Sequence, residues 1–338
     1  MLKIHDNYSL KDNTTFGVNI AAAWYAEPTT AEALVFAITH ARERNWKYYI
    51  TGEGSNLLFT GDFEGLIIHP LVKGITVVDD AATEVLVKAG AGENWDRFVA
   101  HCVEQQWYGA ENLSLIPGSV GAAPVQNIGA YGVEAKDIIA WVEVINTKNM
   151  QPEVISNTAC GFGYRDSIFK HGEPGKYIVT AVVFSLKKNA PLLLDYGNVK
   201  ELFIQRGTQD LHNLRETIID IRNSKLPDPC ETGNAGSFFK NPVIAANEFE
   251  ILRSRYAAAP NYPTGTGRVK IPAAWLIETA GWKGKREGDV GTWPKQPLVI
   301  VNYGNATGRQ IFDFSEKIRL DILEQFGITL DREVTLIS

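Results

Sequence analysis

Residues 114–132, SLIPGSVGAAPVQNIGAYG, constrain the fold of this chain more than any other stretch. The stretch has no charged residue, and Pro117 and Pro124 exclude one long helix across it. Its glycines are Gly118, Gly121, Gly129 and Gly132. Small residues bury little apolar area, but they let a large flat molecule approach the backbone, and free N–H groups in a glycine-rich turn attract an anion. We therefore predict a bulky, phosphorylated cofactor here; a buried loop with tight turns is the alternative.

A second glycine-rich loop follows the predicted strand at residues 46–50. Its sequence is Gly52-Glu53-Gly54-Ser55-Asn56. A dinucleotide fingerprint requires a third glycine at the start of a helix, and Leu57 occupies that position. The loop is therefore not a Rossmann turn, although its N–H groups and the polar side chains of Ser55 and Asn56 suit a pyrophosphate.

Length and composition exclude several classes of protein. With 338 residues the chain is long enough for two or three domains, and its net charge of -6 argues against a general nucleic-acid binder. The three cysteines are far apart and the histidines show no metal-ligand spacing, so we expect a reducing cytoplasm and no bound metal. The polar N-terminal sequence and the lack of a long apolar run predict neither a signal peptide nor a membrane span.

Hydrophobic periodicity predicts an α+β fold. Helices are expected at residues 29–44, with Thr29 and Glu32 as a capping box, and at 94–107, 211–224, 273–279 and 307–326. Strands are expected at 65–70, 74–78, 84–90, 138–146, 177–186, 298–302 and 328–337, with loop-like sequence at 192–200. We place a domain boundary within residues 191–211.

Three residues have surroundings that suit chemistry. Arg165 stands between Tyr164 and Asp166, and could be a fixed guanidinium fork for a carboxylate. Ser237 lies among small residues with no histidine nearby, so it would donate or relay a proton rather than attack. Glu333 is expected in the last strand, on the face opposite Val334 and Leu336. The alternatives are a surface ion pair, a loop serine and a solvated carboxylate.

The order of several motifs resembles one family. GEGSNLL, SLIPGSVGAAPVQNIGAYG, FGYRDSIFK, KLPDP followed by GNAGSFFKNP, and the closing EV occur from about Thr15 to the C-terminus. They resemble the flavin-dependent UDP-N-acetylenolpyruvoylglucosamine reductases of peptidoglycan synthesis (the MurB family). The length and the Tyr196 region resemble the larger class, in which a tyrosine-bearing loop folds over the substrate.

The resemblance implies a two-part FAD-binding domain of the MurB/vanillyl-alcohol-oxidase-like (PCMH-type) fold and a C-terminal α+β substrate-binding domain. The expected divisions are residues 1–70 and 71–210 for the FAD-binding subdomains (FAD region about 17–188), 211–326 for the substrate domain, and 327–338 for the strand that carries Glu333. FAD is expected to be non-covalent, NADPH to be the electron donor, and the protein to be a monomer. The implied FAD contacts are Gly52, Glu53, Gly54, Ser55, Asn56, Pro117, Gly118, Ser119, Gly121, Ala122, Gln126, Asn127, Gly129, Ala130 and Tyr131.

The resemblance also assigns chemistry. Arg165 matches the arginine that pairs with the substrate carboxylate, Ser237 the proton donor, and Glu333 a carboxyl group that must be protonated or share a proton. Contacts to the UDP sugar are expected from Tyr131, Tyr164, Tyr196, Lys225, Asn241 and Gln296. Glu53 departs from the family's usual GGGSN loop, and we expect its side chain to point away from the pyrophosphate. An FAD oxidase of a small alcohol or lactone and a non-catalytic nucleotide-binding relative are the competing hypotheses.

Overall fold

The computed structural model describes residues 2–173, 175–265 and 267–338, and it divides into two compact units. The first unit comprises Met1–Tyr8, Ala22–Glu53 and Glu64–Asn223, and the second comprises Ser9–Ala21, Gly54–Phe63 and Ser224–Ser338. The chain therefore passes between the units several times, and one of these passages lies inside the second glycine-rich loop.

A four-stranded sheet forms the N-terminal part of the first unit. Its strand order is β1 (Ile4–Ser9), β2 (Ala21–Ala26), β5 (Phe63–Ile68) and β3 (Lys47–Ile50). Helix α1 (Ala31–Glu43) packs Leu34 and Ile38 against Leu66 and Ile68 of this sheet. The N-cap is Thr30, whose Oγ1 accepts a hydrogen bond from the Ala33 amide, so the predicted cap at Thr29 was wrong by one residue.

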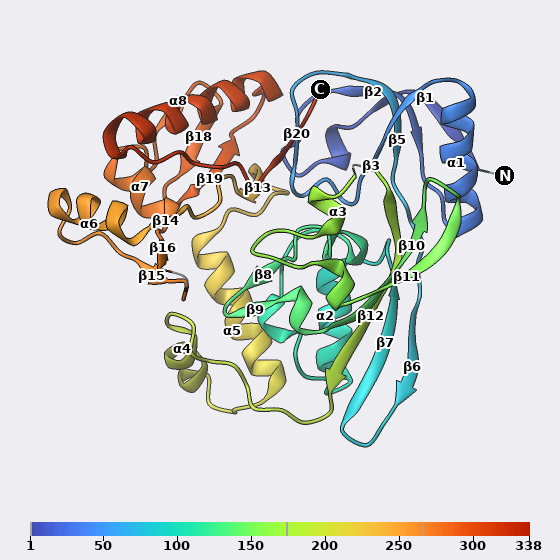
Figure 1. Cartoon of the computed structure of the whole chain (residues 1–338), viewed down its shortest axis with the longest axis horizontal. Helices are drawn as coiled ribbons and strands as arrows, with labels where there is room; N and C mark the ends of the chain where they lie inside the picture. The colour runs from blue at the N-terminus through green and yellow to red at the C-terminus, as the bar shows by residue number, and fades with distance from the viewer. Residues whose placement is uncertain (1, 174, 266) are drawn as a thin grey trace. The chain divides into compact units, whose positions relative to one another are not determined.

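A five-stranded antiparallel sheet forms the larger part of the first unit (Figure 1). Its order is β11 (Gln151–Ser156), β10 (Ile139–Asn146), β12 (Tyr177–Lys187), β7 (Glu84–Gly90) and β6 (Ile75–Asp80). Helix α2 (Trp95–Glu104) contributes Trp95, Phe98 and Cys102 to a core shared with Val87 of β7 and Val182 of β12. The predicted helix at 94–107 and the burial of Cys102 are thereby confirmed.

The rest of the first unit surrounds residues 114–132. Short elements here are β8 (Gly129–Ala130), β9 (Val133–Glu134) and α3 (Ile168–His171), with 3-10 turns at Glu111–Leu113, Val120–Ala122, Ala135–Asp137 and Thr158–Cys160. Helix α5 (Leu211–Lys225) agrees with the prediction. Helix α4 (Val199–Gln205) was missed, because it has less than two turns and is stabilised by burying Val199 and Phe203 against α5.

The second unit is built on a smaller antiparallel sheet. Its order is β13 (Gly233–Ser237), β19 (Gln296–Asn302), β18 (Val290–Trp293) and β17 (Arg286–Glu287). The helices predicted at 273–279 and 307–326 are present, and α7 (Ala273–Thr279) packs on β19 while α8 (Gly308–Phe326) packs on β18 (Figure 1). A second sheet has the strand order β14 (Val243–Ala245), β16 (Arg268–Lys270) and β15 (Tyr262–Pro263). Helix α6 (Ala246–Arg255), which was not predicted, lies between β14 and β15 in the chain. The unit also contains the 3-10 turn Lys11–Asn13.

The C-terminal segment differs from the single strand predicted at 328–337. Only β20 (Thr335–Ile337) is a strand, and it pairs in parallel with β4 (Leu57–Phe59). Glu333 lies in a bend before β20, because residues 331–333 hydrogen-bond instead to the chain after β13. Val334 is buried while Leu336 is exposed, so the alternation proposed for these positions was wrong.

Candidate active site

Residues 114–132, here called the glycine-rich segment, contain no long helix, as Pro117 and Pro124 required. The segment lies against residues 91–95: the Trp95 amide donates to the Gly118 carbonyl at 2.9 Å, and the Gly121 amide donates to Ala91 at 2.9 Å. Its backbone is left-handed at Leu115 (φ 57°), Asn127 (φ 45°) and Tyr131 (φ 47°) as well as at glycines. Such angles are strained for residues with a side chain and persist only where neighbours hold them.

Asp96 holds the first of these strained residues. Its Oδ1 accepts a hydrogen bond from the Leu115 amide at 2.5 Å, and both carboxylate oxygens pair with Arg215 of α5 at 2.7 and 2.8 Å. Burial acts to raise the pKa of Asp96, but the bonds from Arg215 and Leu115 outweigh it and the pKa lies below its ordinary value. The first turn of α2 is thereby fastened both to the glycine-rich segment and to α5.

Two fully buried amides hold the other strained residues. Asn127 donates to Gly163 O at 2.9 Å and accepts from the Lys136 amide at 2.9 Å. The Nδ2 group of Asn112 donates two hydrogen bonds, one to Tyr131 O and one to Leu193 O, each at 2.9 Å. Because Leu193 lies three residues before Tyr196, Asn112 links the glycine-rich segment to the chain that carries this tyrosine.

The second glycine-rich loop contacts this segment within the first unit. A β-carbon at Gly52 would lie 2.6 Å from Ser119 Oγ and 3.6 Å from the Ala122 methyl group, so a larger residue would displace the Ser119 side chain. Glu53 turns toward α2 and accepts bonds from Asn94 Nδ2 at 2.9 and 3.2 Å. Its carboxylate is thus engaged by the residue that caps α2.

The part of this loop that belongs to the second unit begins at Gly54 and has other contacts. Gly54 has φ 65°, and a β-carbon there would lie 2.2 Å from Asn13 O. Asn56 Nδ2 donates to Glu333 O at 3.1 Å, which commits one of its protons. Among the described residues, the amides of Gly52, Glu53, Gly54 and Ser55 make no hydrogen bond to another protein atom. A run of available N–H groups suits a pyrophosphate.

Arg165 lies on the glycine-rich segment. Its Nη2 donates to Gly129 O at 2.7 Å and its Nη1 to Asn127 O at 3.5 Å, while its own backbone is left-handed (φ 55°). The guanidinium carbon lies 5.9 Å from the centre of the half-exposed Tyr164 ring. The two carbonyl groups fix the orientation of this guanidinium, which carries a positive charge at any physiological pH.

Ser237 and Glu333 are brought together in the second unit, although 96 positions separate their numbers. Ser237 ends β13 at a β-bulge, where Gly236 adopts φ 67°. The next residue, Phe238, accepts a hydrogen bond from the Glu333 amide at 2.8 Å. Phe238 and Phe239, which directly follow this strand, are buried and anchor it.

The candidate substrate residues fall into two groups. In the first unit, Tyr131 and Tyr196 meet edge to face with ring centres 5.7 Å apart, and Tyr196 is 57% exposed. Burial raises the pKa of Tyr131, and the charge of Arg222 opposes that shift. The tyrosine pair therefore joins the glycine-rich segment to the Tyr196 region, which Asn112 also does through the backbone.

In the second unit, Lys225, Asn241 and Gln296 occupy different elements. Lys225 is exposed at the end of α5. Asn241 Oδ1 accepts from the Ala273 amide at the start of α7 at 2.9 Å, so its Nδ2 is the group that can donate to a ligand. Gln296 begins β19, and its Oε1 accepts from the Leu298 amide at 3.4 Å.

Comparison with known proteins identifies the family. Residues 228–337 match the family described as "UDP-N-acetylenolpyruvoylglucosamine reductase, C-terminal domain". A UDP-N-acetylenolpyruvoylglucosamine reductase from Bacteroides fragilis strain YCH46 is 45% identical over 334 residues, covering 99% of this chain and 100% of that protein. The chain belongs to the UDP-N-acetylenolpyruvoylglucosamine reductase family. Another member, from Pseudomonas putida KT2440, is 43% identical over 333 residues, 98% of each chain.

Two further comparisons concern fold and cofactor. The crystal structure of the reductase from Thermus caldophilus shares the fold, with a TM-score of 0.71 and 23% identity over 100% of both chains. Residues 22–149 match the family described as "FAD binding domain". The expected family and the α+β class, with an FAD-binding domain and a C-terminal domain, are confirmed. FAD fits the residues present, because the loop at 52–55 has available amides and glycine is required at Gly54.

Sequence reasoning missed residues that this reductase family member uses to shape the segment. Asp96 and Asn112 were not singled out, because an acid in the first turn of a helix and an asparagine before an apolar run are common. The burial that makes Asn112 informative is visible only in the folded structure. Among the described residues, no helix is both long and apolar enough to cross a membrane, and no group of three or more His, Cys, Asp or Glu side chains forms a metal site.

Proposed function

We propose that this chain reduces the enolpyruvyl group of UDP-N-acetylenolpyruvoylglucosamine to give UDP-N-acetylmuramate for peptidoglycan synthesis in the cytoplasm, with NADPH as electron donor. The observation that carries the proposal is the Arg165 guanidinium, fixed 2.7 Å from the Gly129 carbonyl on the glycine-rich segment. A positive charge held at the cofactor-binding stretch is what a reaction that builds negative charge on its substrate requires.

FAD would be held by two stretches of this chain. The loop amides from Gly52 to Ser55 suit its pyrophosphate, and the small residues of the glycine-rich segment suit its flat ring. When bound, FAD supplies the hydride for the double bond. The protein's remaining tasks are to orient the substrate, to stabilise the charge that develops on it, and to deliver one proton.

Arg165 would stabilise the negative charge that develops on the substrate. Addition of hydride to the terminal carbon leaves electron density on the adjoining carbon, conjugated with the substrate carboxylate. A guanidinium beside that carboxylate stabilises the enolate, and its fixed position avoids reorganisation during the reaction. The bonds to the Gly129 and Asn127 carbonyls fix the direction of the Arg165 guanidinium on the glycine-rich segment.

Ser237 and Glu333 would deliver the proton that completes the reduction. A serine hydroxyl is a weak acid, but a carbanion is a stronger base than the alkoxide, so Ser237 can protonate it and recover a proton from solvent or a neighbour. Glu333 helps only in a protonated or proton-sharing form, because a second negative charge would oppose the enolate. The bond from the Glu333 amide to Phe238 O keeps the two residues in one part of the fold.

The remaining candidates would bind the UDP sugar. Lys225 offers a point charge for the diphosphate, Asn241 offers its free amide nitrogen, and Gln296 offers its amide. Tyr196 would close over the sugar nucleotide from the partly exposed position it occupies beside Tyr131.

The test is a two-step reaction with the purified protein under anaerobic conditions. We expect a yellow protein whose flavin absorbance is bleached by NADPH and restored by the enolpyruvyl sugar nucleotide, with one NADPH consumed per product. Flavin oxidation only by oxygen, together with turnover of small alcohols or lactones, would assign an oxidase. A colourless protein that binds no FAD would assign a non-catalytic relative.

A further inference from the structure

The turn that carries Arg165, residues 163–167, is attached to the glycine-rich segment by more than the guanidinium. Gly163 and Asp166 exchange backbone hydrogen bonds of 3.0 and 3.3 Å, which close the turn and leave Tyr164 and Arg165 at its tip. The Arg165 backbone is left-handed (φ 55°). A residue with a side chain keeps such an angle only where its neighbours enforce it, so the position of the Arg165 side chain depends on what holds the turn.

Ser167 ends this turn and is buried. Its Oγ donates a hydrogen bond to the Val125 carbonyl of the glycine-rich segment at 2.5 Å, and it accepts one from the Phe169 amide at 3.2 Å, which caps α3. The Ser167 amide donates to Asp166 Oδ1 at 2.8 Å. A buried hydroxyl that both donates to and accepts from the backbone has one favoured orientation, so Ser167 joins the turn to the segment at a fixed position.

The turn is attached to every second residue of the glycine-rich segment, at Val125, Asn127 and Gly129. Ser167 makes the first attachment, and Asn127 makes the second by donating to the Gly163 carbonyl at 2.9 Å. The guanidinium itself makes the third, with Nη2 donating to Gly129 O at 2.7 Å. A β-carbon at Gly129 would lie 3.1 Å from Arg165 Nη1, so the guanidinium has little room to move toward the segment.

The three attachments differ in what else they do. The guanidinium is the group that the proposed reaction uses, and Asn127 also holds its own left-handed backbone within the expected FAD stretch. Ser167 lies outside that stretch. It is therefore the attachment whose removal changes how Arg165 is held without changing the sequence of the segment on which FAD is expected to lie.

We propose that Ser167 is a positioning residue for the reduction: its hydroxyl fixes the Arg165 turn on the glycine-rich segment, and so directs the guanidinium at the substrate carboxylate. The inference rests on the proposed function and adds to it a residue that acts through Arg165. A shift of about 1 Å in a group that stabilises developing charge can slow a reaction by about 100-fold, so loss of this attachment is expected to slow the substrate step. A serine that only capped α3 would affect stability and leave that step unchanged.

The test compares three variants. Ser167→Ala removes the hydroxyl, and Ser167→Cys replaces it with a thiol of similar size that donates only weakly. Thr147→Val is the matched control, because Thr147 is also buried in the first unit and its Oγ1 donates to the Gly175 carbonyl at 2.7 Å. The FAD content and melting temperature of each purified variant establish that it is folded and loaded.

Rapid mixing measures the two steps separately: reduction of the flavin by NADPH, and its reoxidation by a saturating concentration of the enolpyruvyl substrate. We expect Ser167→Ala to slow reoxidation by about 10- to 30-fold and to leave reduction nearly unchanged, because only the substrate step uses Arg165. Ser167→Cys should show a smaller loss in the same step. Thr147→Val should match the unmodified protein in both rates, even where its melting temperature falls.

A double-mutant cycle tests whether Ser167 acts through the arginine. In the Arg165→Ala background, Ser167→Ala should cause no further slowing of reoxidation, because the group that it positions is already absent. Slowing by the same factor in both backgrounds would show that Ser167 acts by another route and would overturn the inference.

Two results separate failure of this inference from failure of the proposed function. If the flavin of the unmodified protein is not reoxidised by the enolpyruvyl substrate, the proposed function itself is wrong. If it is reoxidised, and folded Ser167→Ala is equally fast, Ser167 does not position Arg165. Should Ser167→Ala fail to fold or to retain FAD, Ser167→Cys decides: slower reoxidation alone supports the inference, whereas unchanged reoxidation or an equal loss in both steps overturns it.

Discussion

The glycine-rich segment and the tyrosine-bearing segment, residues 192–206, are neighbours in the first unit but are held by different forces. The former is fixed by the partly buried Asp96 and the buried Asn112 and Asn127. The latter rests on an apolar cluster, in which Val199 and Phe203 pack on α5. Its polar contacts are few, and Tyr196 remains largely exposed.

The difference matches two kinds of ligand. Buried, fully directed hydrogen bonds specify one conformation, and this suits a cofactor that stays bound. Apolar packing is less directional, so a short helix can detach and return when a substrate enters or a product leaves. We therefore expect changes in the glycine-rich segment to alter chemistry and cofactor, and changes in the tyrosine-bearing segment to alter substrate affinity.

Removing the guanidinium of Arg165 should have the largest effect. We expect Arg165→Ala to slow reoxidation of the reduced flavin by the enolpyruvyl substrate by about 10²- to 10³-fold, because the enolate loses a charge-assisted contact. Reduction by NADPH should be nearly unchanged in rapid-mixing measurements. Arg309→Ala, at an exposed position of α8, is the charge-matched control. Rapid substrate turnover in folded Arg165→Ala would remove Arg165 from the mechanism.

Asp96 tests how far the glycine-rich segment depends on one carboxylate. We expect Asp96→Asn to lower the free energy of unfolding by about 3 kcal/mol, since it leaves Arg215 without a counter-charge. The pKa of Asp96 is depressed in the fold, so its stabilisation is present above the unfolded pKa and is lost as pH falls through the lower, folded pKa. Denaturant titrations across acidic pH should therefore show a smaller pH dependence in Asp96→Asn. An unchanged profile would contradict the assignment.

Local patterns predicted the parts of the fold whose cause is local. Prolines excluded a helix from the glycine-rich segment, and the apolar stripes of α2 and α8 identified helices that are present. The helix predicted at 307–326 is bounded by Thr307, whose Oγ1 accepts from the Gln310 amide, and by Gly327 at φ 70°. These signals need no knowledge of tertiary partners.

The sequence could not predict features that depend on contacts between distant parts of the chain. Helix α4 exists because Val199 and Phe203 find α5, and the bend at Glu333 exists because residues 331–333 pair with the chain after β13. The motifs around Arg165, Ser237 and Glu333 were recognised from the resemblance. The neighbours Asp96 and Asn112 were not recognised, since their role depends on which atoms face them in the fold. The roles of the three motif residues stay predictions.

Phe203 tests the apolar attachment of the tyrosine-bearing segment. It is almost fully buried, so Phe203→Ala should destabilise α4 locally by about 3 kcal/mol through lost burial and a cavity. We expect faster proteolysis within residues 192–206 and a raised KM for the sugar nucleotide, with FAD content unchanged. Phe36→Ala, at an exposed position of α1, is the control. Loss of FAD from Phe203→Ala would mean that the two segments are not independent.

Asn112 hydrogen-bonds to both segments, so its substitution tests whether they are held independently. Asn112→Leu keeps the approximate shape but removes the donors to Tyr131 O and Leu193 O, and we expect a loss of about 2 kcal/mol in unfolding free energy. A double-mutant cycle with Phe203→Ala measures the coupling. Because both changes release the tyrosine-bearing segment, their effects on KM should be less than additive. Full additivity would show that the Leu193 contact does not position Tyr196.

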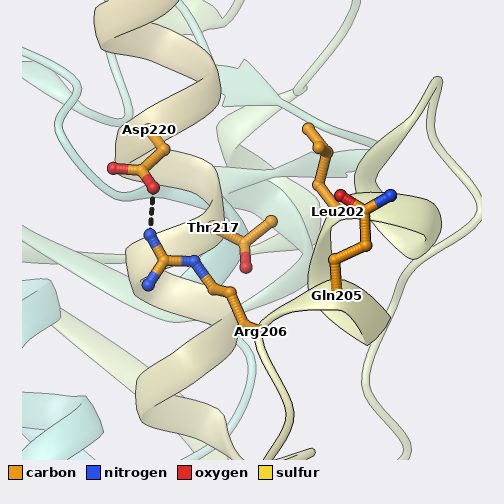
Figure 2. Close-up of a pocket in the computed structure, with 5 residues that line it drawn as sticks. All are labelled: Leu202, Gln205, Arg206, Thr217 and Asp220. Atoms are coloured by element: carbon orange, nitrogen blue, oxygen red, sulfur yellow. Dashed lines mark hydrogen bonds and ion pairs between the residues drawn. The ribbon is translucent and has the colours of Figure 1, made fainter.

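The Arg206–Asp220 ion pair should contribute least, although it also joins the tyrosine-bearing segment to α5 (Figure 2). The Asp220 side chain is 64% exposed, so water and salt screen the attraction, and we expect Arg206→Met to change unfolding free energy by less than about 1 kcal/mol. Denaturant titrations at low and high salt provide the measurement, and the small difference should vanish at high salt. A larger, salt-independent loss would mean that the ion pair, and not the Phe203 cluster, holds this segment in place.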